Sequence, residues 1–164
     1  MHYFDLAFFD VDKSFSKRLG YEKVYEFGKD VILGDRYDAN KTMIVESSNP
    51  SELSKAIKGR AVGVIIKDNE LEKRVIEDAS SYGKPILIST NTLISDYTSR
   101  ARNIYRAKRL LAFSMRSGAD VLIVTMAHNR EFLLSYYQLM SIARFLGAGD
   151  AYAKKMVSKL GDIL

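Results

Sequence analysis

The fold is decided by the stretch AVGVIIKDNELEKRVIEDASSYGKPILIS, which covers residues 61–89. It begins and ends with short apolar runs rich in β-branched residues, and such runs are typical of strands that are covered on both faces of a parallel sheet. Between them, residues 69–82 show the apolar spacing of a helix, and Gly83 follows. Because two parallel strands need a long crossover connection, the stretch predicts a β-α-β unit.

The same alternation continues on both sides of this unit. Another nearly continuous apolar run, VLIV, starts at Val121. The predicted strands span residues 3–9, 23–27, 30–33, 42–46, 61–66, 85–89 and 120–125. The predicted helices span residues 49–58, 69–82, 97–117, 129–146 and 150–160, and each precedes a glycine, the residue expected at a left-handed C-cap.

Strands that alternate with helices at this spacing indicate an α/β fold with mostly parallel strands and helical crossovers. Both an open doubly wound sheet and a (β/α) barrel fit the pattern. The predicted strands come close in number to those of a TIM-like barrel, but such a barrel typically has about 250 residues. With 164 residues, the chain is expected to be a single domain, residues 1–164, and a barrel of this length would be abbreviated, with few helices in its first half.

The composition is that of a globular protein, with 47% hydrophobic and 27% charged residues. Cysteine is absent, so disulfides, thiolate metal sites and cysteine nucleophiles are excluded. Residues 1–11 carry Asp5 and Asp10 instead of a basic start, which argues against a signal peptide. No apolar run approaches the roughly 18 residues of a membrane span. We therefore expect a cytoplasmic protein.

The net charge of +5 hides an asymmetry along the chain. Residues 1–95 hold 14 Lys and Arg against 15 Asp and Glu, whereas residues 96–164 hold 11 against 5. On the predicted helix 97–117, four arginines fall opposite the apolar face, and no acidic residue lies between them. These are Arg102, Arg106, Arg109 and Arg116. Since surface helices usually offset like charges with Glu at helical spacing, this face indicates an anionic partner.

Arginine makes planar, two-pronged contacts with phosphate, and Tyr105 and Phe113, which flank the arginines, are suited to stacking on unpaired bases. We therefore predict that the chain binds RNA. The predicted RNA-binding residues are Arg100, Arg102, Arg106, Lys108, Arg109, Arg116, His128, Lys154, Lys155 and Lys159. The alternative interpretation is a solvated face that neutralises acids elsewhere in the fold.

The sequence offers no complete catalytic constellation. It holds two histidines, and His128, with no second histidine or cysteine nearby, makes a poor metal site. Asp5 alternates with Phe4 and Leu6, so its side chain is expected on the opposite strand face, inside a barrel, where a charge must be paired. Arg100 is expected near the strand ends where barrel sites form, or in an ion pair with Asp5.

Four segments together resemble the family of archaeal ribonuclease P protein component 3. They are YFDLAFF at residue 3, SRARNIYRAKRLL at 99, ADVLIVTMAHN at 119 and IARFLGAGDAYAKKMVSKLGDIL at 142. The resemblance covers roughly residues 61–164 and the first predicted strand. It implies a (β/α) barrel related to the metal-dependent phosphoesterases of the PHP superfamily. Where that superfamily carries a His-x-His metal motif, this chain has Asp5 and Ala7, so the metal chemistry is not carried over.

Members of this family assist a catalytic RNA that removes the 5′ leader from precursor tRNA. The resemblance implies that the chain binds ribonuclease P RNA and precursor tRNA, pairs with a second small ribonuclease P protein and binds no cofactor itself. In such an assembly the RNA subunit holds magnesium ions and performs the hydrolysis, so the endoribonuclease is the holoenzyme.

Two alternatives stay open at this point. One is a small metal-dependent phosphoesterase on the same barrel, with a divalent ion near Asp5, Arg100 and His128. The other is a protein-binding module that uses apolar surface residues. These residues are Phe132, Tyr136 and Tyr137.

Overall fold

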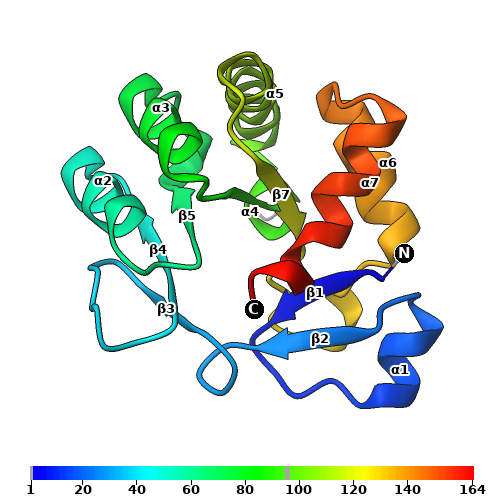
Figure 1. The fold of residues 1–164 in the computed structure, drawn as a ribbon. Coiled ribbons are helices and arrows are strands. Elements are labelled where there is room, and N and C mark those ends of the chain that lie inside the picture. Colours follow the sequence, from blue (N-terminus) through cyan, green and yellow to red (C-terminus); the bar gives the residue numbers. More distant parts are fainter. Residues whose placement is uncertain (1, 95–96) are drawn as a thin grey trace.

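The computed structural model of the chain describes residues 2–94 and 97–164. Short parallel strands alternate with helices along the chain, and most of the helices stand on the outer side of the strands (Figure 1). The strands are β1 (Phe4–Ala7), β2 (Lys23–Glu26), β3 (Ile32–Gly34), β4 (Met43–Ser47), β5 (Gly63–Ile66), β6 (Ile86–Ser89) and β7 (Val121–Val124). Each of them overlaps one of the predicted strand segments, so the predicted positions of the strands along the chain are confirmed.

All the predicted helices form, and two short ones were not predicted. The predicted helices are α2 (Pro50–Lys58), α3 (Lys73–Tyr82), α5 (Arg100–Ser117), α6 (Tyr136–Leu146) and α7 (Asp150–Ser158). The additional ones are α1 (Lys13–Arg18) and α4 (Thr90–Ile94), and short 3₁₀ turns occur at η1 (Lys67–Asn69), η2 (Arg130–Phe132) and η3 (Lys159–Asp162). In residues 2–94 and 97–164, no helix is long and apolar enough to cross a membrane.

Three helices, α3, α5 and α6, begin later than their apolar spacing predicts. Asp68 and Asn69 adopt left-handed φ angles of 55° and 52°, which are incompatible with the predicted start of α3 at residue 69. Asn129 caps η2 instead of α6. Ser135 and Gln138 then form a capping box that starts α6. The predicted left-handed C-cap is found at Gly83, Gly118 and Gly147 but not at Gly59 or Gly161.

The strands form two parallel sheets rather than one continuous ladder. β1 pairs with β2, and β3 to β7 pair in sequence order. Single bridges link the two sheets, from Ala7 to Ala127 and from Phe27 to Val31. The backbone N–H of Phe8 also donates to the carbonyl of Ala127 at 2.8 Å. The predicted α/β fold with parallel strands and helical crossovers is confirmed, whereas ladder pairing among the described residues does not close a barrel.

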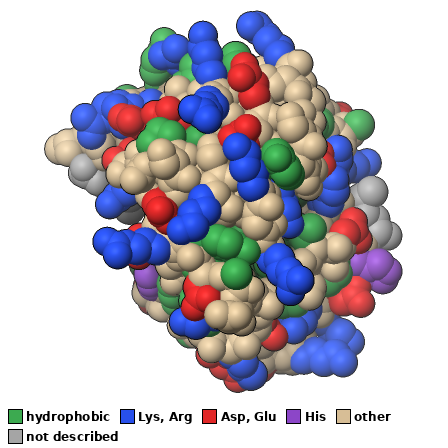
Figure 2. All heavy atoms as spheres, turned by 60° about the vertical axis from the view of Figure 1, so that its left-hand side comes forward, with side chains coloured by type: hydrophobic (Ala, Val, Ile, Leu, Met, Phe, Trp, Pro, Cys, Tyr) green, Lys and Arg blue, Asp and Glu red, His purple; other side chains and the backbone are tan. Residues whose placement is uncertain are grey.

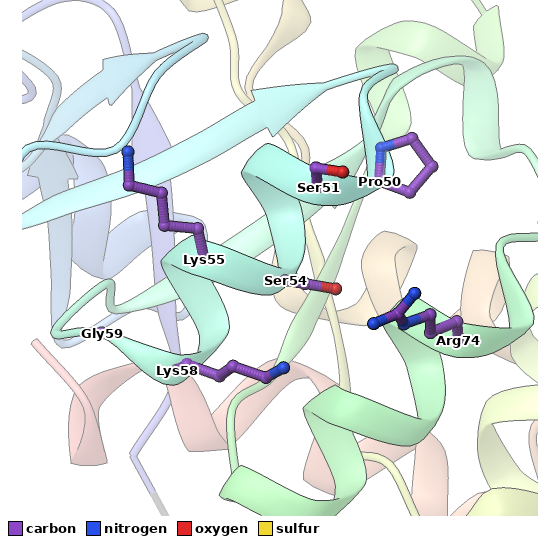
Figure 3. Close-up of a pocket in the computed structure, with 7 residues that line it drawn as sticks. All are labelled: Pro50, Ser51, Ser54, Lys55, Lys58, Gly59 and Arg74. Atoms are coloured by element: carbon purple, nitrogen blue, oxygen red, sulfur yellow. The ribbon is translucent and has the colours of Figure 1, made fainter.

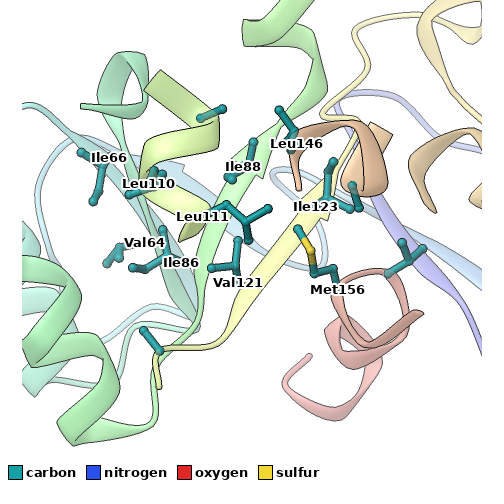
Figure 4. Packing of buried hydrophobic residues seen from close by; sticks show 14 of the residues in the cluster. Val64, Ile66, Ile86, Ile88, Leu110, Leu111, Val121, Ile123, Leu146 and Met156 are labelled. Atoms are coloured by element: carbon teal, nitrogen blue, oxygen red, sulfur yellow. The ribbon is translucent and has the colours of Figure 1, made fainter. Parts of the chain in front are cut away.

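One apolar cluster lies between the strands and the helices that cover them. Ile86 and Ile88 of β6 pack there with Leu110 and Leu111 of α5 (Figure 4), and all four side chains are buried. Burying a side chain of this size contributes about 1.5–3 kcal/mol to stability. This cluster therefore fixes α5 on the sheet and determines which side of the helix faces outward.

A second apolar cluster covers the opposite face of the strands. Its members include one buried side chain from each of six strands, namely Leu6, Tyr25, Ile44, Ile65, Leu87 and Leu122. Leu160, near the C-terminus, belongs to the same cluster. Gly161 lies so close to Phe4 that a Cβ atom built on the glycine would fall 2.1 Å from a ring carbon. Side chains and the C-terminal turn therefore fill the space on this side of the strands.

Candidate nucleic-acid interface

Helix α5 turns one side to solvent because the other side is anchored. Ala107, Leu110 and Leu111 are buried in the cluster between strands and helices. The side-chain amide of Asn103 donates to the carbonyl of Thr92 at 3.0 Å, which ties the first turn of α5 to α4. Because helical spacing fixes the remaining positions, the outward side of α5 carries the polar and charged residues.

Four arginines come together on this outward side, as the sequence predicts. Arg102, Arg109 and Arg116 are exposed, and none of them forms an ion pair with a residue that the structure describes. The Arg106 guanidinium, in contrast, lies 3.0 Å from the Glu70 carboxylate. The absence of acids between the arginines on α5 therefore did not exclude a salt bridge at Arg106, because the pairing acid comes from the turn before α3.

The two aromatic residues beside the arginines differ in accessibility. Tyr105 is 61% exposed, and the Arg109 guanidinium lies 5.7 Å from its ring centroid. Phe113 is half-buried, and the Lys73 ammonium of α3 lies 5.8 Å from its ring centroid. Tyr105 is thus the more accessible ring, with the Arg109 guanidinium over it, whereas Phe113 is partly covered.

Arg100 and Lys108, also on α5, are held by neighbours within the fold. Arg100 donates to the carbonyl of Ile94 at 2.9 Å, and its guanidinium lies 5.6 Å from the ring centroid of Tyr97. It therefore makes no ion pair with Asp5, which the sequence left open. The Lys108 ammonium lies 4.3 Å from the ring centroid of Phe145 on α6. Both cations stay at the exposed surface.

Two of the three predicted lysines near the C-terminus are paired. Lys155 lies 2.5 Å from one carboxylate oxygen of Asp120, and Lys159 pairs with the other. Burial alone would raise the pKa of Asp120, but hydrogen bonds from the two lysines outweigh burial and hold that pKa below its usual value. Lys154 is exposed without an ion pair to any described residue. A single carboxylate thus compensates part of the positive charge that Lys154, Lys155 and Lys159 bring to this end of the chain.

His128 lies at the C-terminal ends of the strands, where it closes a stack of three rings. Its ring lies 4.4 Å from that of Phe8, nearly parallel at 8°, and Phe8 stacks in turn on Phe27 at 4.5 Å. His128 is exposed, whereas the two phenylalanines are half-buried. The sequence analysis missed Phe8 and Phe27 as neighbours of His128, although each directly follows a strand as His128 follows the last one.

Asp5 lies on the strand face opposite Phe4 and Leu6, as predicted, but helices cover that face, so the expectation that Asp5 lies inside a barrel is wrong. Leu6 belongs to the second apolar cluster, and Asp5 points to the helices on the other side of the strand. The backbone N–H of Thr125 donates to one Asp5 oxygen at 2.7 Å, and its hydroxyl donates to the other at 2.5 Å. Burial raises the pKa of Asp5 to about 7 against the lowering effect of these hydrogen bonds.

The three residues proposed for a phosphoesterase site, Asp5, Arg100 and His128, contact different neighbours. Asp5 bonds to Thr125, Arg100 to Ile94, and His128 stacks on Phe8, so the three residues have no partner in common. No group of three His, Asp or Glu side chains in the described part of the chain is arranged to hold a metal ion.

The apolar residues predicted for protein binding are partly accessible. Phe132 is 47% and Tyr137 is 64% exposed. Tyr136 is half-buried and stacks on Tyr3 with a centroid separation of 4.1 Å. Phe132 and Tyr137 therefore remain available at the surface near the start of α6.

The structure also brings cationic residues to α5 that the sequence analysis did not select. A groove of about 610 Å³ runs between the start of α3 and α5, and Lys73 and Arg74 line it together with Arg106 and Arg109. Figure 2 shows Lys and Arg side chains spread over the face that carries α2 and α3, with fewer acidic side chains between them. These residues escaped notice because the first 95 residues are nearly neutral overall.

Comparison with known proteins identifies relatives of the fold. No protein-family model and no curated protein sequence matches the chain. A chain in the cryo-EM structure of archaeal ribonuclease P with mature tRNA is similar in structure, with a TM-score of 0.68 and 16% identity over 93% of this chain and 76% of that chain. The crystal structure of A. niger ochratoxinase gives a TM-score of 0.50 and 14% identity over 71% of this chain and 29% of that chain. At such identities the similarity establishes the fold alone.

Proposed function

We propose that this chain is a protein subunit of ribonuclease P, which binds the catalytic RNA and assists removal of the 5′ leader from precursor tRNA. The observation that carries the proposal is the row of exposed arginines on α5, Arg102, Arg109 and Arg116, without ion-pair partners among the described residues. The chain presents this row on a fold similar to a chain of archaeal ribonuclease P with mature tRNA.

The physical role of α5 follows from its anchoring. The helix is held rigidly by its buried side, so its guanidinium groups approach an RNA backbone with little loss of backbone freedom on binding. Each guanidinium offers planar donors that match phosphate oxygens. Neutralising phosphates in this way releases counterions, so binding is expected to weaken as salt rises. Tyr105 adds an accessible ring next to the arginines for a base that is not paired.

The proposed family, barrel type and protein partner rest on the sequence resemblance. We assign the chain to the protein component 3 family and its fold to an abbreviated, PHP-like (β/α) barrel. A second small ribonuclease P protein is its proposed partner, for which exposed Phe132 and Tyr137 provide the kind of aromatic surface that protein interfaces favour. In this proposal, magnesium ions and the hydrolytic step belong to the RNA subunit.

Reconstitution tests the proposal directly. Archaeal ribonuclease P RNA is combined with the other protein subunits of the enzyme, with or without this chain, and cleavage of a precursor tRNA is followed. We expect the chain to raise the rate of leader removal and to bind the RNA. If it neither binds this RNA nor changes the rate of cleavage, the proposal is wrong.

A matched pair of variants distinguishes specific RNA contacts of α5 from a general effect of positive charge on RNA binding. Arg102→Gln/Arg116→Gln removes two charges from the arginine row, whereas Lys13→Gln/Lys17→Gln removes two from α1. The α1 lysines line a groove whose basic and acidic residues are equal in number. We expect weaker RNA binding for the α5 variant and wild-type binding for the α1 variant. Equal weakening of both would show non-specific attraction.

A further inference from the structure

We infer that the RNA-binding surface is not confined to α5 but crosses α3 to reach α2, and that an RNA sugar-phosphate backbone lies along it. This inference rests on the proposed function and adds a binding surface to it. The surface, called here the basic track, consists of Lys55 and Lys58 on α2, Lys73 and Arg74 on α3, and Arg106 and Arg109 on α5.

The first part of the basic track is a groove between α2 and α3. It has a volume of about 530 Å³, and its charged lining residues are Lys55, Lys58 and Arg74. Figure 3 shows Arg74 reaching from α3 toward Ser54 on α2, and Lys58 reaching from α2 toward α3. No acidic side chain lines this groove among the described residues. The charged side chains that line the groove are therefore all basic, although the Asp78 carboxylate of α3 approaches Lys58 to 3.9 Å.

The second part is the groove between the start of α3 and α5. Arg74 lines this groove as well as the first, so the two grooves adjoin at that residue. From there the lining passes to Arg106 and Arg109, and thus onto the arginine row of α5. A ligand that lies across Arg74 can contact cations on three successive helices.

The acids near the basic track do not cancel its charge. Glu70 and Glu72 line the second groove, and Glu70 is already paired with Arg106 at 3.0 Å. Below the first groove, Asp78 accepts a hydrogen bond from Ser54 at 2.7 Å, and its carboxylate lies 3.9 Å from the Lys58 ammonium. Six cations thus stand against three acids, Glu70, Glu72 and Asp78, which leaves a net charge of +3. The groove beside α1, by comparison, has as many acids as cations.

The lining chemistry favours a nucleic-acid backbone over an acidic protein. Protein interfaces are built around aromatic and other apolar residues, whereas the larger apolar residues that line these two grooves are only Pro50 and Leu71 among the described residues. Protein–nucleic acid interfaces are polar and strongly positive. A single phosphate would occupy one groove, but a polymer with regularly spaced phosphates uses cations on three helices. The basic track therefore fits an RNA backbone.

The test compares three double variants of the full-length chain, each of which loses two positive charges. Lys58→Gln/Arg74→Gln removes charge from the α2–α3 groove, Arg102→Gln/Arg116→Gln from α5 outside both grooves, and Lys13→Gln/Lys17→Gln from α1. Glutamine keeps part of the aliphatic stem, and thermal unfolding checks that each variant is folded. Binding to in vitro transcribed ribonuclease P RNA is measured across a series of salt concentrations.

We expect the Lys58/Arg74 variant to bind about 10- to 30-fold more weakly at physiological salt, with a log–log salt slope reduced by about 1.4–1.8, the value for two lost phosphate contacts. The Lys13/Lys17 variant should bind like wild type. If only the Arg102/Arg116 variant binds the RNA more weakly, the inference that RNA lies along the basic track is wrong while the proposed function stands. If the wild-type chain does not bind the RNA at all, the proposed function fails as well. Equal weakening of all three variants would also overturn the basic track, because it would show general attraction.

Discussion

Thr125, the residue that follows β7, holds the Asp5 carboxyl of β1 with both its backbone N–H and its hydroxyl, at 2.7 and 2.5 Å. The two residues are 120 positions apart, so this contact joins the first strand of the chain to the last. Asp5 is fully buried, and burial raises its pKa to about 7. The join therefore depends on a carboxyl group that changes its charge near neutral pH.

The first prediction concerns the pH dependence of stability. In the unfolded chain an aspartate has a pKa of 3.8, whereas folded Asp5 has one of about 7. Between these values the folded state keeps a proton that the unfolded state has lost, so the stability due to Asp5 falls as pH rises. We expect the free energy of unfolding to be about 2–3 kcal/mol higher near pH 5 than near pH 8. Urea unfolding at both pH values measures this difference.

Asp5→Asn is the informative variant, because asparagine mimics the neutral form of the side chain. We expect it to fold and to lose most of this pH dependence. Asp12→Asn is the matched control. A hydrogen bond from the Phe15 backbone lowers the pKa of exposed Asp12, so this carboxyl group stays charged between pH 5 and pH 8. If the stability of Asp5→Asn depended on pH as that of the wild type does, Asp5 would not be the source of the pH dependence.

A second prediction concerns the C-terminal turn. Three ring carbons of Phe4 lie 2.1–2.5 Å from the position of a Cβ atom on Gly161, so Gly161→Ala must displace the ring or the turn. We expect a loss of about 1–3 kcal/mol in stability. Gly149→Ala is the control, because a Cβ there meets nothing within 4 Å and φ is −70°. Equal melting temperatures for the two variants would show that the turn is not packed as described.

The sequence predicts the long elements of the fold because their signals are local. The apolar runs that form β5, β6 and β7 and the helical spacing of α5 each need only neighbouring residues to be recognised. The helix starts were harder to predict. Left-handed φ angles at Asp68 and Asn69 and the capping box at Ser135 override the apolar periodicity that extends past them. Helices as short as α1 and α4 carry too few residues for a periodic signal.

The candidate interface could be predicted only where it lies on one element. The row that includes Arg102, Arg109 and Arg116 is visible in the sequence because one helix carries all of it. The pairing of Arg106 with Glu70 joins two elements, and so do the grooves that Arg74 lines. Such relations depend on how the helices pack, which composition and spacing do not encode. The sequence analysis placed Asp5 on the correct face of β1 but misjudged which face packs against the helices, for the same reason.

A third prediction concerns the lysine pair on Asp120. Hydrogen bonds from Lys155 and Lys159 lower the pKa of Asp120 in spite of its burial, so the charged form stabilises the fold. We expect Asp120→Asn to lower the free energy of unfolding by about 1 kcal/mol near pH 7, because the ion pairs of Asp120 with the two lysines are partly exposed. This difference should disappear as the pH falls through the pKa of Asp120. Asp162→Asn, an exposed acid with no ion pair among the described residues, should cost nothing. Urea unfolding of both variants across pH measures the effect.

The last prediction concerns the only ion pair that the α5 arginines make within the described part of the chain. Glu70 holds Arg106 at 3.0 Å with a side chain that is 53% exposed, and an exposed pair of this kind contributes at most about 1 kcal/mol to stability. Glu70→Gln should therefore leave the fold intact, remove one negative charge from the groove between α3 and α5, and free Arg106 for a phosphate.

We expect Glu70→Gln to bind ribonuclease P RNA about 2- to 5-fold more tightly at physiological salt, with a log–log salt slope steeper by about 0.7–0.9 for the added contact. Glu77→Gln removes an equal charge from the exposed side of α3 outside the groove, and it should change binding little. Weaker binding of Glu70→Gln would mean that Glu70 positions Arg106 for RNA rather than competing with it. Salt-dependent binding curves for the two variants distinguish these outcomes, because a positioning role lowers affinity without steepening the slope.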